Sequence, residues 1–401
     1  MADIVYTPTE RSRARARRRE LTQEAPLLAR LDWVMLGAVL AIVAYGIWGI
    51  AGITRHDVAG SPDYYVYRQL VFVAVGLLGL VLAILIDPEI YHRFGKQLYA
   101  GTLGLFALVF LAGTVARGSK RWIDLGFFRF QPSEFGKLLV VVALAGFLAN
   151  RFRRMDEWRS SLTAIALAVP PMLLVFVQPD IGSALVYAAA LVGVLLVAGV
   201  RWLHLAVYAI VAVVLALSVL WWLPSVGMPV LKGYQTSRLT GFFHPDQDPR
   251  GSTYNVRQSI TAVGSGGATG RGVAGATQTS LDFLPEHATD FVFASFAEQR
   301  GFVGAGFLLM LYLLVVWRGL KVVVTAARDP YSAIVAGGIV FAFLFQIFVN
   351  VGMTIGIAPV TGIPLPMVSV GGSSMIANLL AIGVLQAIHA RGRGRTRIAP
   401  W

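Results

Sequence analysis

The sequence predicts an all-α integral membrane protein, a bundle of about ten transmembrane helices with a long extracytoplasmic loop between the seventh and eighth. Two observations predict this class. Of the 401 residues, 56% are hydrophobic and only 14% are charged, whereas soluble domains carry about 25% charged residues. The hydrophobic residues also form segments of about 20, the length that crosses a bilayer as a helix. The absence of cysteine excludes disulfides, thiolate chemistry and cysteine metal sites.

Ten segments have the length and composition of a membrane span. They lie at residues 32–53, 69–86, 98–116, 133–149, 162–178, 181–200, 203–223, 301–317, 332–353 and 373–390. The fifth and sixth are separated only by the sequence QPD at 178–180, which predicts a tight hairpin at one membrane surface. An even number of spans puts both ends of the chain on the same side of the membrane.

The basic residues predict which side is cytoplasmic. A basic arm at 1–31 and a basic tail at 391–401 flank the transmembrane domain at 32–390. Lysine and arginine are retained on the cytoplasmic side of membrane helices and attract anionic lipids, so we expect both termini in the cytoplasm. The formal charge of +13 is also compatible with nucleic-acid binding. The positive charge is concentrated beside apolar spans. This favours membrane lipids as the partner and argues against nucleic acid.

Two regions that this topology places outside break the charge rule. One is 117–134, which contains Arg117, Lys120 and Arg121, and the other is the loop 224–300. Long loops are translocated whatever their charge, which accounts for the second region better than for the first. The alternative is that cations on the outer face bind an anionic ligand.

The loop 224–300 is too long for a passive connector, and its aromatic residues argue against disorder. Its glycine run, VGSGGATGRGVAGATQ at 263–278, lacks the spacing of a Walker or dinucleotide-binding loop. Two interpretations remain. The run is either a flexible loop at the membrane surface, which the glycines alone favour, or backbone brought close to a phosphate or sugar.

Ionisable residues near the predicted spans are candidates for function. Lys137 lies about one helical turn inside the fourth span, with Glu134 on the same helical face. Asp180 lies at the tip of the 178–180 hairpin. Ionisable groups at this depth are costly and mark either a functional cavity or a structural ion pair, and both interpretations stay open. The six histidines have no metal-ligand spacing, which argues against zinc.

An acidic cluster lies in the sequence LDFLPEHATDF at 281–291, with Asp282, Glu286 and Asp290. Pro285 suits the first position of a helix, which would put Glu286 and Asp290 on one helical face. Carboxylates in a first turn are also ordinary partners of the helix dipole, and the spacing alone favours that explanation. The predicted position outside, opposite the basic region, favours a catalytic base acting on an amphiphile with a phosphate leaving group.

Four motifs together resemble the SEDS family (shape, elongation, division and sporulation), in particular its RodA-like members. They are KRWIDLGFFRFQPSEFGKL (120–138), QPDIGSALV (178–186), YNVRQSITAVGSGGATGRGVAGATQTSLDFLPEHATDFVFASFAEQRGFVG (254–304) and NVGMTIGIAPVTGIPLPMVSVGGSS (350–374). Two positions depart from the family pattern. Ala288 stands where the family has histidine, with His287 preceding it, and Val370 replaces a tyrosine. Whether a neighbour such as His287 substitutes for the missing histidine is open.

The resemblance implies a peptidoglycan glycosyltransferase in the bacterial cell membrane, with both termini cytoplasmic and its active site on the extracytoplasmic face. It would join lipid II units into β-1,4 glycan strands with release of undecaprenyl pyrophosphate, beside a class B penicillin-binding protein. Asp290 is expected to be the catalytic base and Lys137 to neutralise the leaving pyrophosphate. The expected substrate contacts are Glu134, Arg117, Lys120, Arg121, Glu286, Asp180, Gln258, Ser259 and Ser369.

The sequence requires no cofactor and assigns no metal ligands. A divalent cation, Mg²⁺ or Mn²⁺, held by the pyrophosphate with Glu134 or Asp180, could share the charge neutralisation. Three alternatives to a polymerase of cell elongation and rod shape stay open: a lipid II flippase, an FtsW-like polymerase of the division septum, and a non-catalytic scaffold. A flippase would line a path across the bilayer midplane with polar groups, whereas the interiors of these spans are nearly free of charge.

Overall fold

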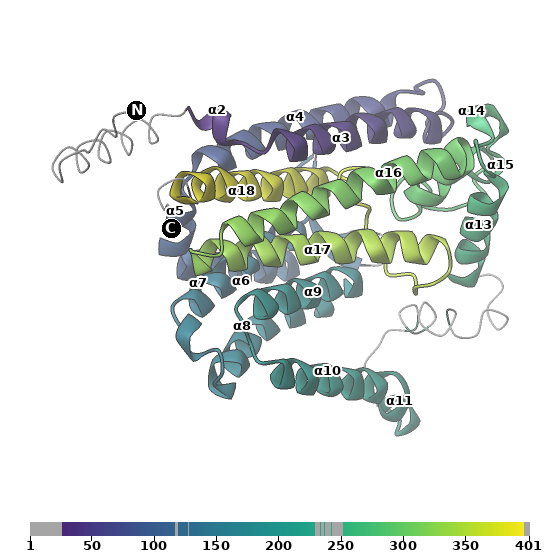
Figure 1. The fold of residues 1–401 in the computed structure, drawn as a ribbon. Coiled ribbons are helices and arrows are strands. Elements are labelled where there is room, and N and C mark those ends of the chain that lie inside the picture. Colours follow the sequence, from purple (N-terminus) through teal and green to yellow (C-terminus); the bar gives the residue numbers. More distant parts are fainter. Residues whose placement is uncertain are drawn as a thin grey trace, which may run out of the picture.

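The structure is a computed structural model that describes residues 26–116, 119–126, 128–228, 233, 236, 242 and 252–396. Most of the predicted basic arm 1–31 and about half of the tail 391–401 lie outside these residues, as does much of the predicted loop 224–300. The described chain is a bundle of long, roughly parallel and antiparallel helices (Figure 1).

Ten long helices form the bundle in the described part of the chain, and each overlaps one of the ten predicted spans. They are α3 (Trp33–Ile53), α4 (Tyr64–Leu85), α6 (Gly95–Ala112), α7 (Pro132–Ala149), α8 (Trp158–Val177), α9 (Ile181–Val197), α10 (Trp202–Leu217), α16 (Val292–Thr325), α17 (Pro330–Thr354) and α18 (Gly372–Thr396). Within the described residues, nine of them are long and apolar enough to cross a membrane, α10 together with its extension to Ser225, and α9 is a shorter apolar helix of 17 residues. The predicted bundle of about ten transmembrane helices is confirmed.

Short elements connect the spans. The helical ones are α2 (Leu27–Arg30), α5 (Pro88–Arg93), η1 (Phe152–Arg154), η2 (Ser218–Trp222), α11 (Leu223–Ser225), α13 (Ser252–Ser265), α14 (Gly272–Gly275) and α15 (Thr277–Ser280). Strands β1 (Thr114–Ala116), β2 (Ser119–Asp124) and β3 (Arg129–Phe130) pair antiparallel in that order. The sheet lies directly before α7, the helix that carries Glu134 and Lys137.

The core of the bundle consists of α7, α17 and α18. In α18, 89% of the apolar span is buried inside the protein, against 72% in α7 and α17 and 6% in α10. Figure 1 shows α17 and α18 in the middle, between α3 and α4 on one side and α8 and α10 on the other. Small residues allow the close contact: a Cβ at Gly383 of α18 would lie 2.5 Å from the Leu80 carbonyl oxygen of α4.

The beginning of α3 and the C-terminal half of α18 lie at the same end of the bundle. The backbone N–H of Asp32 donates to Gln386 Oε1 at 2.9 Å, and Gln386 Nε2 donates to the Asp32 carbonyl at 3.0 Å. The buried Asp32 carboxylate also pairs with Arg318 of α16 at 2.7 Å. The described ends of the chain therefore lie on one side, as the even number of spans predicts. The opposite end, here called the loop end, carries the described parts of 54–63, 113–131, 178–180, 226–291 and 355–371.

One predicted span, 98–116, ends in the wrong place. The helix α6 stops at Ala112, Gly113 adopts an extended conformation, and residues 114–116 form β1. Thr114 and Val115 are β-branched, so the chain leaves the helix where helix propensity falls. Lys120 of β2 then donates to the Phe110 carbonyl at 2.6 Å, which satisfies an unpaired C=O at the end of α6.

The glycine run of the long loop packs against the backbone of α16. Gly301 interrupts that helix with φ 67° and ψ −170°. Beyond it, the N–H of Phe302 donates to the Gly267 carbonyl at 2.8 Å and the N–H of Val303 to Ala268 at 3.0 Å. The glycines therefore permit two backbones to touch, and the run is not a free loop at the membrane surface.

We expect the substitution Gly301→Ala to destabilise the protein. A Cβ there would lie 2.3 Å from the Gly270 nitrogen, and the backbone conformation, essentially restricted to glycine, costs other residues about 1–3 kcal/mol. Thermal unfolding in detergent measures the loss. Gly306→Ala lies in the same helix, and apart from the helix's own backbone and its chain neighbours no atom lies within 4 Å of the added Cβ. It is the control and should unfold at the wild-type temperature or above it. Equal unfolding temperatures for both variants would contradict this account.

Candidate active site

The buried pair Glu134–Lys137 lies in the first two turns of α7. Pro132 occupies the first helical position, where its missing N–H costs nothing. Lys137 Nζ donates to Glu134 Oε2 at 2.8 Å, and the two side chains are 8% and 3% exposed. A small cavity of about 30 Å³ adjoins them, lined also by Gln346 of α17 and Asn378 of α18. The predicted structural pair is therefore present, and it lies beside a cavity.

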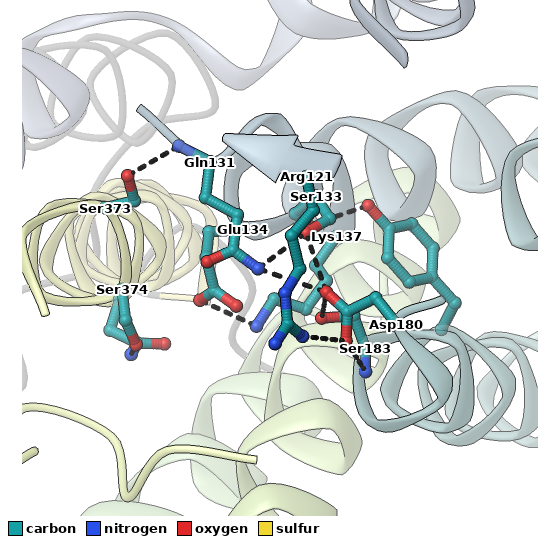
Figure 2. A network of polar contacts seen from close by, with 11 residues as sticks. Arg121, Gln131, Ser133, Glu134, Lys137, Asp180, Ser183, Ser373 and Ser374 are labelled. Atoms are coloured by element: carbon teal, nitrogen blue, oxygen red, sulfur yellow. Dashed lines mark hydrogen bonds and ion pairs between the residues drawn. The ribbon is translucent and has the colours of Figure 1, made fainter. Parts of the chain in front are cut away.

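Asp180 is the centre of a hydrogen-bond network between α7, α9 and β2 (Figure 2). Its carboxylate caps the N-terminus of α9 by accepting from the Ser183 N–H at 3.1 Å. Four side chains surround the same carboxylate: Ser183 Oγ at 2.9 Å, Gln131 Nε2 at 3.1 Å, Ser133 Oγ at 3.4 Å and Arg121 Nη1 at 3.5 Å. With so many donors, Asp180 acts here as the group that orients Gln131 and Arg121.

The guanidinium of Arg121 lies at the edge of this network and is partly exposed. It stacks over the Trp122 ring, 4.5 Å from the centroid. Its buried Nε has no hydrogen-bond partner among the described residues. A planar cation held from two sides and partly exposed is suited to an anionic oxygen.

Three helix N-termini meet at the same place. The N–H of Gln131, which precedes α7, donates to Ser373 Oγ in the first turn of α18 at 2.8 Å. Gln131 and Ser133 contact Asp180 at the start of α9, and Tyr187 of α9 donates to the Ser133 carbonyl at 2.8 Å. Each helix carries about half a positive charge at its N-terminus. The convergence of α7, α9 and α18 therefore favours an anion at this position of the loop end.

The segment 281–291 is a compact turn, and the predicted helix beginning at Pro285 is wrong. Glu286 has a left-handed φ of 57°, and α16 begins only at Val292. The N–H groups of Thr289 and Phe291 both donate to the Glu286 carbonyl at 3.1 Å. The Thr289 hydroxyl also donates to Glu286 Oε2 at 2.7 Å, a local contact of the kind that competes with helix formation. Glu286 and Asp290 consequently do not share a helical face.

The backbone around Asp290 is held through three successive carbonyl groups, each of which accepts a hydrogen bond. Val370 N donates to the Ala288 oxygen at 2.9 Å, Ser369 Oγ to the Thr289 oxygen at 2.6 Å and Asn350 Nδ2 to the Asp290 oxygen at 2.9 Å. These contacts use the main chain of Asp290 and fix its position without engaging the carboxylate. Ser369, predicted as a substrate contact, here supports the segment that carries the candidate base.

The segment 361–374 joins the two parts of the site. Ser369 and Val370 hold the Asp290 turn, and Ser373, a few residues later, contacts Gln131 at the start of α7. Gly182 of α9 packs so closely on this segment that a Cβ would lie 2.6 Å from the Thr361 oxygen. The Asp290 turn and the Asp180–Lys137 group thus belong to one polar region at the loop end.

The remaining predicted site residues have different surroundings. Lys120 binds the Phe110 carbonyl at the end of α6. Ser259 is fully buried and donates to the Thr354 carbonyl of α17 at 2.7 Å, a contact that holds α13 on the bundle. Gln258 is partly exposed on α13, and Arg117 lies outside the described residues. These four stay predictions as substrate contacts.

Three residues that support the site were not recognised in the sequence. Asn350 is fully buried and bridges the carbonyls of Asp290 and Ile363. Gln131 and Ser133 connect α7 to Asp180. All three lie inside the motifs that carry the family resemblance, and a polar amide at the end of an apolar span was the available signal for Asn350.

The described side chains do not form a metal site by themselves. No group of three or more histidine, aspartate or glutamate side chains that could hold a metal occurs in the part of the chain that the structure describes. Glu134 is paired with Lys137, and Asp180 accepts from several donors. The divalent cation expected between the pyrophosphate and Glu134 or Asp180 stays a prediction.

Comparisons with known proteins agree with this architecture. The sequence model of the FtsW/RodA/SpoVE family, described as cell cycle protein, matches residues 29–394. The chain belongs to this family. It is 36% identical to the peptidoglycan glycosyltransferase MrdB of Escherichia coli K12 over 362 residues, 90% of this chain and 93% of MrdB. It is 33% identical to stage V sporulation protein E of Bacillus subtilis over 333 residues, 82% of this chain and 88% of that protein.

Two solved structures share the fold. One is a chain of a peptidoglycan synthase complex described as coordinating polymerization and crosslinking, with a TM-score of 0.76, 32% identity, and coverage of 90% of this chain and 98% of that chain. The other is the rod shape determining protein RodA of Thermus thermophilus, with a TM-score of 0.65, 28% identity, and coverage of 90% and 96%. The predicted membership of the SEDS family is confirmed.

Proposed function

We propose that this multi-pass membrane protein is a peptidoglycan glycosyltransferase that polymerises lipid II and releases undecaprenyl pyrophosphate, in elongation and rod-shape maintenance. The observation that carries the proposal is the polar region at the loop end. There, a carboxylate on a fixed backbone is joined through 361–374 to three converging helix N-termini. Relatives named as peptidoglycan glycosyltransferases, similar over nine-tenths of the chain, support it.

The reaction is an inverting displacement. The 4-hydroxyl oxygen of the acceptor sugar attacks C1 of the donor, and the bond from C1 to the pyrophosphate oxygen breaks. The hydroxyl proton goes to the Asp290 carboxylate, whose main chain is fixed by the contact from Asn350. The electron pair of the broken bond goes to the pyrophosphate, whose growing charge is stabilised by donors prepared in advance.

The charges near the leaving group decide which groups stabilise it. Arg121 and Lys137 are balanced by Asp180 and Glu134, so these four side chains carry no net charge. The N-termini of α7, α9 and α18 add positive potential, although Asp180 caps α9 and Glu134 lies in the first turn of α7. Arg121 and Lys137 then supply directed N–H donors to the phosphate oxygens, with Asp180 and Glu134 keeping them in place.

The site is proposed to face the cell exterior, with both termini in the cytoplasm. The basic ends of the chain favour this orientation. A class B penicillin-binding protein is the proposed partner, because a similar chain occurs in a peptidoglycan synthase complex that combines polymerization with crosslinking. Lipid II and the surrounding lipids would contact the apolar outer faces of the bundle, such as that of α10.

The main rival is a lipid II flippase, which makes no bond. Purified protein in one detergent phase, supplied with lipid II and its penicillin-binding partner, distinguishes the two functions. We expect glycan strands, visible by gel electrophoresis as a ladder, in a reaction that is lost with Asp290→Asn. If the wild-type complex produced no glycan under conditions in which a related polymerase does, the proposed function would be wrong.

A further inference from the structure

His287 connects two loops that are far apart in the sequence. Its Nε2 lies 3.0 Å from Oδ1 and 3.2 Å from Oδ2 of Asp57, in the loop between α3 and α4. Its Nδ1 lies 3.1 Å from the Leu284 carbonyl oxygen. The imidazole is buried, with its side chain 10% exposed, and the Asp57 side chain is 20% exposed. The histidine thus connects the 281–291 turn to the loop that joins α3 and α4.

Both ring nitrogens of His287 face hydrogen-bond acceptors, an arrangement that favours the protonated ring. A neutral imidazole carries one N–H and satisfies one of the two contacts, whereas the imidazolium donates to both. Two charged groups face the ring: Asp57 from the α3–α4 loop and, at 3.5 Å, the exposed Asp282 from the same turn. Burial lowers the pKa of His287, but the hydrogen bonds to Asp57 and Leu284 and the charges of Asp57 and Asp282 together outweigh it and raise the pKa above its ordinary value.

The position of His287 within the turn links it to Asp290. The turn closes through the N–H groups of Thr289 and Phe291, which donate to the Glu286 carbonyl beside His287. The carbonyls of residues 288–290 are held from the other side by Asn350 and the 369–370 segment. On the N-terminal side, Leu284 is buried in an apolar cluster with Phe291. The Asp57 contact anchors the part of the turn between these two supports.

We propose that His287 is a positioning residue for Asp290, acting as an imidazolium that locks the 281–291 turn onto Asp57 of the α3–α4 loop. The effect on catalysis rests on the proposed function, whereas the locking of the turn does not. A displacement of the base by about 1 Å is enough to reduce a rate up to about 100-fold.

The sign of the pH dependence follows from the raised pKa. Because the folded protein binds this proton more tightly than the unfolded chain, the contact contributes fully below the ordinary histidine pKa. It is lost as the pH rises through the raised value. The lock is therefore closed in acid and opens in alkali.

The test compares the pH profiles of kcat and KM for lipid II polymerisation. His287→Gln should lower kcat about tenfold at pH 6 with KM unchanged, and the difference from the wild type should shrink as the pH rises. Asp57→Asn should move the alkaline limb to lower pH. His287→Lys, which keeps a positive charge, should hold activity to higher pH than the wild type. His56→Gln, an exposed histidine in the same loop as Asp57, should leave the profile unchanged.

Hydrogen exchange gives a reading that does not depend on activity. After correction for intrinsic rates, the protection of the Thr289 and Phe291 amides should fall with rising pH in the wild type and be independent of pH in His287→Gln. Wild-type protection in His287→Gln would overturn the proposal. A wild-type pH profile in Asp57→Asn would overturn it as well, so the test stands even if one of the two substitutions impairs folding. A wild-type protein that is inactive but shows pH-dependent protection would refute the proposed function and retain the lock.

Discussion

Replacing Asp290 by asparagine is expected to lower lipid II polymerisation about 10²–10⁴-fold, because a positioned general base contributes a rate factor of that size. The amide has nearly the shape of the carboxylate but cannot accept the proton of the acceptor hydroxyl. The main-chain contact from Asn350 and the neighbouring contacts from Ser369 and Val370 do not involve the carboxylate. Thermal unfolding near the wild-type temperature would assign the lost rate to the missing base and not to misfolding.

The measurement is the initial rate of glycan formation by the complex with its penicillin-binding partner, beside thermal unfolding. Asp63→Asn is the matched control, since Asp63 is an exposed aspartate at the loop end whose side chain makes no capping bond to α4. It should polymerise at the wild-type rate. An Asp290→Asn protein that keeps most of that rate would show that another group takes the proton.

The membrane fold was predictable because one physical term dominates it. A helix needs about 20 mostly apolar residues to cross the hydrocarbon core of a bilayer, and this requirement marks all ten segments in the sequence. Boundaries depend on smaller energies. The end of α6 at Ala112 depends on a local loss of helix propensity and on a bond from Lys120. Hydropathy averaged over a window is not sensitive to either effect.

The site was only partly predictable, because its supporting contacts join residues distant in sequence. Asn350 and Asp290 are 60 positions apart, and His287 and Asp57 are 230 apart. Charge and motif identified Asp290, Lys137 and Asp180 as candidates. The helix expected at Pro285 failed because the side chain of Thr289 binds within the turn, and no periodicity reveals such a competitor.

The substitution Lys137→Met should reduce both stability and activity, for separable reasons. Removing the ammonium leaves the Glu134 carboxylate, 3% exposed, without its partner at 2.8 Å. Breaking a buried pair in this way costs about 3–5 kcal/mol. The variant also loses a donor to the leaving pyrophosphate, and one such donor is worth a rate factor of about 10²–10³. A fall in yield alone therefore does not distinguish a structural pair from a catalytic lysine.

The double substitution Glu134→Gln with Lys137→Met separates these roles. A neutral amide beside an apolar chain of similar volume removes the unpaired charge, so unfolding in detergent should return close to the wild type. If Lys137 acts on the leaving group, polymerisation stays low in this stable protein. The single variant Glu134→Gln completes the comparison, since it retains the lysine: substantial activity there, with none in the double variant, assigns the loss to Lys137. Recovery of both stability and rate in the double variant would instead make the pair purely structural, and the helix N-termini with Arg121 would then have to stabilise the pyrophosphate.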